Sequence, residues 1–258
     1  MKSTLLIILL LLFFIPTVLF GQGKDSNKVK RHLYISANAG IGMPSGIFGN
    51  SYYGNSYRGY ANIGFSVNLL TEIPIRQSYF GIAGIVAYNS NSFDLSSFIK
   101  NQIIIPTSQS GGNYNMVTIL PGVYGILPFN GGGISFHFLV GGIWFSTPAL
   151  AYSGTQQYYS AWYGDNTGNW VITSASRVAV AIDYGMSLKC LLSKRLFWLF
   201  NVDFTHSELN GGFNTTPQFT LISIGGPNLG NYRAPTNDEL SYSFITQFNF
   251  TTGLGYRF

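Results

Sequence analysis

The sequence has 258 residues, of which 46% are hydrophobic, 16% aromatic and only 9% charged, and its formal net charge is +5. A typical soluble domain carries roughly 25% charged residues, and disordered chains are rich in charge and poor in aromatics, so this composition excludes both classes. Much of the folded surface is therefore expected to face something other than water.

The first segment, residues 1–21, has the features of a secretory signal peptide. Lys2 precedes the apolar run Leu5–Ile15, and Pro16 and a small residue follow. A spanning helix needs about 20 apolar residues, whereas a short apolar core behind a positive charge is typical of an export signal. We predict a signal peptide here and a basic periplasmic leader over residues 22–31. An uncleaved membrane anchor is the alternative.

Hydrophobicity then alternates with a period of two, which is typical of β-strands with two different faces. Eight segments show this period or are compatible with it, namely 32–43, 59–70, 78–90, 113–126, 134–147, 177–189, 196–205 and 241–258. The third, fourth and fifth are ambiguous in face because they are rich in glycine or apolar on both sides. Pro121 removes a hydrogen-bond donor inside the fourth segment, so we predict a bulge there.

The last segment shows the two faces most clearly. Its stretch "QFNFTTGLGYRF" places large apolar side chains at alternate positions, with polar or small residues between them. One side of this strand is therefore suited to lipid and the other to a polar interior.

The connections between the eight segments alternate strictly in length. Short links are expected at 71–77, 127–133 and 191–194, and long links at about 44–58, 91–112, 148–175 and 208–240. Membrane barrels have short turns on one side and long loops on the other, and their strands alternate apolar outside and polar inside. The predicted fold is all-β, an eight-stranded antiparallel up-and-down transmembrane β-barrel over residues 32–258. A secreted β-sandwich does not predict this alternation of link lengths.

The signal peptide, the eight alternating strands and the terminal "GLGYRF" resemble the small outer-membrane barrels of Gram-negative bacteria, the class of the OmpA transmembrane domain, OmpX and PorT-like proteins. The resemblance implies export to the cell outer membrane, contact with outer-membrane lipid, and insertion by the barrel-assembly machinery. It also implies that a C-terminal assembly signal consists of Phe250, Leu254, Tyr256 and Phe258. Thr252 departs from the apolar pattern of that signal.

The predicted lumen face carries charged residues that we expect to form a structural network. Its members are Arg177, Asp183, Lys189, Asp203 and Arg257. A tight turn between the sixth and seventh segments gives partners whose numbers sum to about 385, which places Asp183 near Asp203. Two neighbouring buried carboxylates can also share a proton and act as acid and base, which is the alternative interpretation.

No residues are predicted to be catalytic, to bind a cofactor or to bind a metal. The single Cys190 and three histidines give no metal-ligand spacing. His206 and Ser207 resemble part of the His-x-Ser-Asn motif of outer-membrane lipid A deacylases, but adjacent strand residues point to opposite faces. An eight-stranded barrel is filled by its own side chains, so a wide solute channel is not expected, although narrow water or ion leakage remains an alternative.

The sequence thus favours a non-enzymatic outer-membrane barrel with a structural or interaction role. Its long links contain "SYYGNSY", "TQQYYSAWYG" and "GNW", and Tyr, Ser and Asn are typical of adaptable binding surfaces. An unknown extracellular ligand or a membrane-complex partner is the expected kind of contact. Export argues against nucleic acid. A lipid A-modifying enzyme and a narrow channel are the alternatives.

Overall fold

The structure, a computed structural model, describes residues 32–49, 59–75, 78–101, 104–156, 166–208, 218–224 and 244–258. Residues 32–258 form one compact unit, and the predicted signal peptide and leader lie outside the described residues. Within the described ranges, no helix has the length and apolar character needed to cross a membrane.

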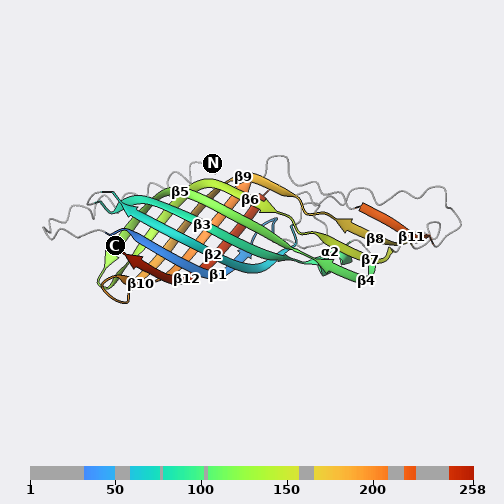
Figure 1. Cartoon of the computed structure of the whole chain (residues 1–258), viewed down its shortest axis with the longest axis horizontal. Helices are drawn as coiled ribbons and strands as arrows, with labels where there is room; N and C mark the ends of the chain where they lie inside the picture. The colour runs from blue at the N-terminus through green and yellow to red at the C-terminus, as the bar shows by residue number, and fades with distance from the viewer. Residues whose placement is uncertain are drawn as a thin grey trace, which may run out of the picture. The chain divides into compact units, whose positions relative to one another are not determined.

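Eight antiparallel strands close into a barrel, as Figure 1 shows. They are β1 (Tyr34–Pro44), β2 (Ala61–Pro74), β3 (Phe80–Phe93), β5 (Asn113–Phe129), β6 (Gly132–Ser146), β9 (Ser176–Leu191), β10 (Leu196–Glu208) and β12 (Phe244–Arg257). Each predicted segment corresponds to one of these strands, so the predicted all-β barrel is confirmed. The strands are up to 17 residues long, as in β5, whereas crossing a membrane needs about 9 to 11.

The first and last barrel strands pair with each other and close the sheet. Their register runs from Tyr34 opposite Arg257 to Pro44 opposite Gln247. Beyond it, the Phe258 backbone N–H donates to the Leu33 carbonyl oxygen at 3.0 Å. Closure leaves no open sheet edge, which is the condition for placing strands in lipid.

The outer wall of the barrel is apolar, and much of the inner wall is polar or small. Ile119, Val178 and Leu254 are all more than half exposed on the outside, whereas Ser66 and Asn68 on the inside are almost fully buried. An apolar exterior around a polar interior is the arrangement of outer-membrane barrels. The chain is therefore a transmembrane barrel of that type. Its short turns, which face the periplasm in such barrels, lie at the end opposite the long connections, so we call them the periplasmic turns.

The predicted bulge at Pro121 is absent from the described β5–β6 ladder. Ile119 faces Gly142 and Gly122 faces Leu139, so the register is the same on both sides of the proline. Pro121 points outward, and its missing N–H leaves a gap in the ladder without inserting a residue.

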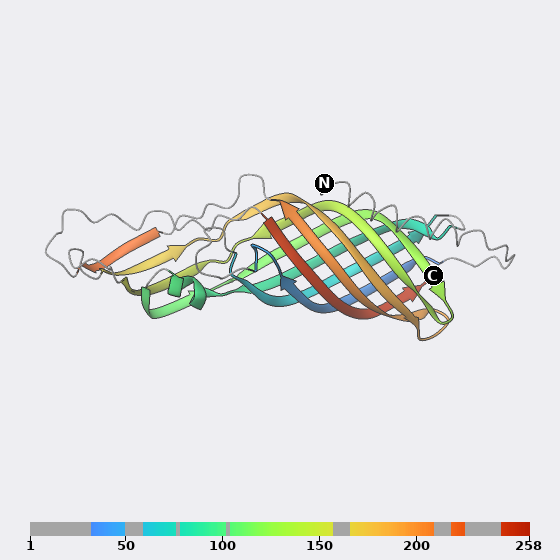
Figure 2. The same ribbon diagram turned by 180° about the vertical axis from the view of Figure 1, so that it is seen from behind.

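Three of the long connections contain regular structure that the sequence did not indicate. They contribute β4 (Ile104–Gly111), β7 (Leu150–Gln156), β8 (Asn166–Ile172) and β11 (Gln218–Ile224), which pair in the order β11-β8-β7-β4. Figure 2 shows these short strands together with α2 (Leu95–Asn101). The quoted stretch at 51–57, and residues 157–164 of "TQQYYSAWYG", lie outside the described residues. We refer to the four short strands as the surface sheet.

Buried aromatic residues pack together where the barrel strands meet the long connections. This aromatic cluster consists of Phe48, Tyr60, Phe93, Phe98, Tyr114, Phe145 and Tyr152. Tyr114 stacks on Phe145 with ring centroids 5.5 Å apart, and its hydroxyl donates to the Gly59 carbonyl at 2.5 Å. Phe98 of α2 contacts Tyr152 of β7 edge to face. The cluster therefore joins barrel strands to parts of the long connections.

Candidate functional site

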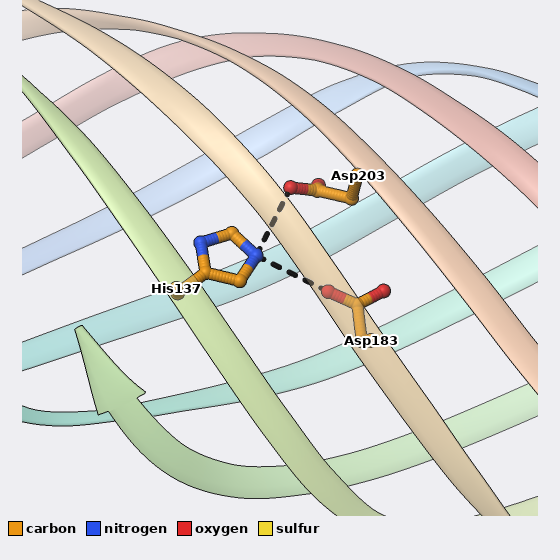
Figure 3. Close-up of side chains that lie close together, drawn as sticks. All are labelled: His137, Asp183 and Asp203. Atoms are coloured by element: carbon orange, nitrogen blue, oxygen red, sulfur yellow. Dashed lines mark hydrogen bonds and ion pairs between the residues drawn. The ribbon is translucent and has the colours of Figure 1, made fainter. Parts of the chain in front are cut away.

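Three ionisable side chains meet in the barrel interior, and we call His137, Asp183 and Asp203 the lumen triad. They come from the neighbouring strands β6, β9 and β10 (Figure 3). Gly185 of β9 faces His137 on one side and Asp203 on the other. Because Gly185 has no side chain, the two residues reach toward each other above it. Asp183 lies two positions away on the same face of β9.

The imidazole of His137 faces both carboxylates with the same nitrogen. Its Nε2 lies 3.1 Å from Asp183 Oδ1 and 3.3 Å from Asp203 Oδ1 (Figure 3). All three residues are at most 5% exposed. One ring nitrogen carries at most one proton, so Nε2 can donate to only one of the two carboxylates, and its shorter contact is with Asp183. When Nε2 donates to Asp183, Asp203 Oδ1 has no other donor among the described residues.

A chain of polar side chains fixes the orientation of Asp183. The Thr205 hydroxyl donates to Asp183 Oδ2 at 2.6 Å, and the Asn249 amide donates to Thr205 Oγ1 at 3.3 Å. Gln247 in turn donates to Asn249 at 2.6 Å. The triad is therefore embedded in a network of neutral polar groups that extends across β10 and β12.

A second charged group lies nearer the periplasmic turns. The Lys189 ammonium donates to Glu72 Oε2, and the Ser135 hydroxyl donates to the other oxygen of Glu72 at 2.9 Å. The Lys189 ammonium also lies 4.6 Å from the centroid of the Tyr34 ring and 5.7 Å from that of Tyr124. This ion pair is electrically neutral and buried, so it does not compensate the charge of the lumen triad.

The five residues predicted as one network have different environments. Asp183 and Asp203 belong to the lumen triad, and Lys189 pairs with Glu72. Arg177 is exposed near the beginning of β9, and the Arg257 guanidinium donates to the Lys194 carbonyl in a periplasmic turn. Neither arginine is within ion-pair distance of a carboxylate of the triad among the described residues.

The expected pairing sum of 385 was wrong by three residues. Asp203 faces Gly185, and Asp183 faces Thr205, so the residue numbers of each facing pair sum to 388. The turn occupies residues 192–195, so it lies one residue later in the chain than the expected link 191–194. The two aspartates are therefore diagonal neighbours and meet through His137.

Sequence reasoning missed His137 and Glu72. His137 lies in "SFHFL", where Phe136 and Phe138 point outward, and this local alternation was the available signal. Glu72 was assigned to the link 71–77, but β2 continues to Pro74 and directs Glu72 into the lumen. The triad supplies one imidazole nitrogen and two carboxylates, with ligand atoms within 4.8 Å of one another. The histidine spacing in the sequence gave no indication of this grouping.

His206 and Ser207 do not form a nucleophile and base pair. His206 stacks on Phe244 on the outer side, whereas the buried Ser207 hydroxyl donates to the Val180 carbonyl at 2.8 Å. The predicted separation of these two residues onto opposite faces is confirmed. A nucleophile must lie within hydrogen-bond reach of its base, so this pair lacks the required geometry.

The residues of the predicted assembly signal lie along β12 and just after it. Leu254 and Phe258 are strongly exposed, and Phe250 and Tyr256 are half-buried. Tyr256 accepts a hydrogen bond from Arg195 at 2.9 Å and packs edge to face against Phe258. Their recognition by the barrel-assembly machinery remains a prediction.

Comparison with protein-family models gives no match, and none of the curated proteins is similar enough in sequence to count as a relative. Solved structures with a related fold include Ail, the attachment invasion locus protein of Yersinia pestis, at 12% identity and a TM-score of 0.38, covering 88% of this chain and 97% of that one. Neisserial surface protein A is 8% identical, with a TM-score of 0.39 and the same coverage. A major outer membrane protein from Thermus thermophilus is 12% identical, with a TM-score of 0.42, covering 88% of this chain and 98% of that one.

Proposed function

We propose that this chain is a non-enzymatic outer-membrane barrel that binds a partner through its long surface connections. The observation that carries the proposal is the surface sheet, in which β4, β7, β8 and β11 come from three different connections. Connections that only join strands need no pairing with one another. Pairing across three of them gives a defined backbone from which the intervening Tyr-rich residues can be presented.

The barrel interior supports a structural role for the wall. The aromatic cluster packs at the end near the long connections, and buried polar residues and the Lys189–Glu72 pair fill the lumen below it. An eight-stranded barrel has room for side chains and little else. This packing disfavours the channel alternative, and the separation of His206 from Ser207 disfavours a deacylase.

The test compares two variants of the full chain in its native outer membrane. In one, residues 150–172, which contain the β7–β8 hairpin, are replaced by a short Gly-Asn linker. In the matched control, a linker is inserted into the periplasmic turn at 130–131. We expect cross-linking and affinity purification to recover a partner with the wild type and the control, and to lose it with the hairpin replacement. Recovery of the same proteins by all three chains contradicts a binding role for the surface sheet.

Two further measurements separate the alternatives. We expect lipid A mass spectra to be unchanged when the chain is overexpressed, because the described residues contain no assembled nucleophile and base at His206 and Ser207. We also expect planar bilayers containing the purified barrel to be silent. A new lipid A species supports the enzyme instead, and stepwise conductance supports the channel.

A further inference from the structure

The lumen triad has more negative charge than its protein partners compensate. When both are ionised, Asp183 and Asp203 carry two negative charges, and among the described residues His137 is the only ionisable group within ion-pair distance of them. Buried charges are costly unless they are paired. Even a protonated imidazole leaves one negative charge, whereas a divalent cation beside a neutral imidazole balances both.

Asp203 is a buried carboxylate with an oxygen that lacks a hydrogen-bond partner among the described residues. It is 3% exposed, and the one group among the described residues that could donate to its Oδ1 is His137 Nε2, which lies closer to Asp183. Figure 3 shows both carboxylates converging on the same nitrogen. Buried polar atoms without a partner are few in most folded proteins, and a carboxylate oxygen among them calls for a specific explanation. The convergence of the two carboxylates is the arrangement expected of ligands directed at an ion.

The distances agree with three ligands around one small cation. For zinc bound at about 2.1 Å, ligand atoms of a tetrahedron stand about 3.4 Å apart. The two separations from His137 Nε2 are 3.1 and 3.3 Å, and all three ligand atoms lie within 4.8 Å of one another. An imidazole with two carboxylates suits first-row transition cations better than magnesium or calcium, which prefer oxygen alone.

The surroundings support one of the three ligands, Asp183, whereas His137 Nδ1 has no hydrogen-bond partner among the described residues. Thr205 donates to the second oxygen of Asp183 and so fixes that carboxylate, and Asn249 supports Thr205. Gly185 keeps the space open, because a Cβ there lies 2.4 Å from Asp203 Oδ1 and 2.7 Å from His137 Nε2. Such outer contacts orient ligands and contribute to metal affinity.

From these observations we propose that His137, Asp183 and Asp203 bind one divalent transition-metal ion, with zinc as the probe, inside the barrel wall. The proposal is independent of any surface partner, since it concerns the lumen alone. All three side chains are at most 5% exposed, so the ion is bound as the barrel folds, and its role is to join β6, β9 and β10 from the inside.

The experiment refolds the full chain into lipid vesicles with zinc or with a chelator. After removal of free metal, we expect one tightly held zinc per wild-type chain and a higher urea midpoint in the zinc-refolded sample, because an ion that binds only the folded state stabilises it. In a sample with isotope-labelled histidine, zinc should shift the nitrogen resonances of His137 and leave those of His206 unchanged. That measurement needs no variant and so does not depend on a mutant that folds.

Variants locate the ion. We expect Asp203→Asn to weaken zinc binding at least about tenfold, the lower limit seen even for outer contacts of metal ligands. His206→Gln and Glu208→Gln, which alter outward or exposed residues of the same strand, are the matched controls and should bind as the wild type does. Metal-free wild-type protein, or equal binding by wild type and Asp203→Asn, overturns the proposal. Metal-free wild-type protein would mean that protons balance the charge of the triad. Equal binding by the variant would mean an adventitious ion only.

Discussion

At the scale of single residues, Gly185 determines whether the lumen triad can assemble. His137 and Asp203 approach each other over this residue, and an added Cβ meets Asp203 Oδ1 at 2.4 Å. We expect Gly185→Ala to destabilise the barrel by about 1–3 kcal/mol, the usual cost of overpacking. The measurement is urea unfolding in lipid vesicles, followed by gel migration of the folded form.

Gly142 provides the control for that substitution. It lies on the outer face of β6, and a Cβ there has no atom within 4 Å. Gly142→Ala should therefore leave the unfolding midpoint nearly unchanged. Equal effects of the two substitutions would show that strand propensity, and not the space above Gly185, determines the loss.

The Glu72 and Lys189 pair gives a second test of residue-scale electrostatics. Both side chains are at most 4% exposed, so water cannot solvate either charge when its partner is removed. We expect Glu72→Gln to destabilise the barrel by about 3–5 kcal/mol, because it leaves the ammonium buried and unpaired. Adding Lys189→Met should recover most of this loss. A double variant that is as unstable as the sum of the two single variants contradicts the pairing.

At the scale of elements, the seven-residue helix α2 depends on one capping carboxylate. Asp94 Oδ1 accepts from the Ser97 backbone N–H at 3.0 Å and from the Ser96 hydroxyl at 2.8 Å. Burial raises the pKa of Asp94, but hydrogen bonds from Ser97 and Ser96 outweigh it, so the pKa lies below its ordinary value. The stabilisation is therefore present above the pKa of the unfolded chain and is lost as the pH falls through the folded value.

Amide hydrogen exchange in α2 measures this dependence. We expect Asp94→Ala to cost the helix about 0.5–2 kcal/mol, as for other N-caps, with the rest of the barrel unaffected. Asp94→Asn keeps the acceptor and should retain much of the protection, but without the loss on acidification. Protection that falls equally with pH in wild type and Asp94→Asn would assign the effect to another group.

At the same scale, the aromatic cluster packs inside the end of the barrel near the long connections. Tyr114 is fully buried between Phe48, Phe93 and Phe145. Its replacement by alanine should cost about 3–5 kcal/mol, as for other buried aromatics. Tyr79→Ala, at an exposed position beside a periplasmic turn, should cost much less in the same urea titration. Similar losses at both positions would show that burial in the cluster does not determine the cost.

The barrel strands were predictable because lipid and lumen impose opposite demands on alternate residues. This constraint is strong in β12, where apolar and polar or small residues alternate except at Ile245, Thr246 and Thr252. It is absent from β4, whose sequence "IIPTSQSG" includes Pro106 and has no apolar face. Local pattern therefore gave no signal for the surface sheet, whose pairing joins segments far apart in the chain. The grouping of the lumen triad could not be predicted for a related reason, because it depends on the exact register of three strands.

At the scale of the whole molecule, β1 and β12 close the barrel by pairing in a single continuous antiparallel register. Closure is what allows an apolar exterior and a buried, charged interior in the same sheet. Ala39 faces Thr252 across this seam, and both point outward. A disulfide between cysteines at these positions would join the two ends of the barrel without disturbing the lumen.

The measurement is the migration of Ala39→Cys/Thr252→Cys, in a Cys190→Ser background, after oxidation in the membrane and boiling without reductant. We expect a cross-linked band that reverts on reduction, and a much weaker one for Ala39→Cys/Leu254→Cys, in which the second cysteine is displaced by two residues. Equal cross-linking of both pairs, or none in a membrane-inserted chain, would contradict the closed barrel.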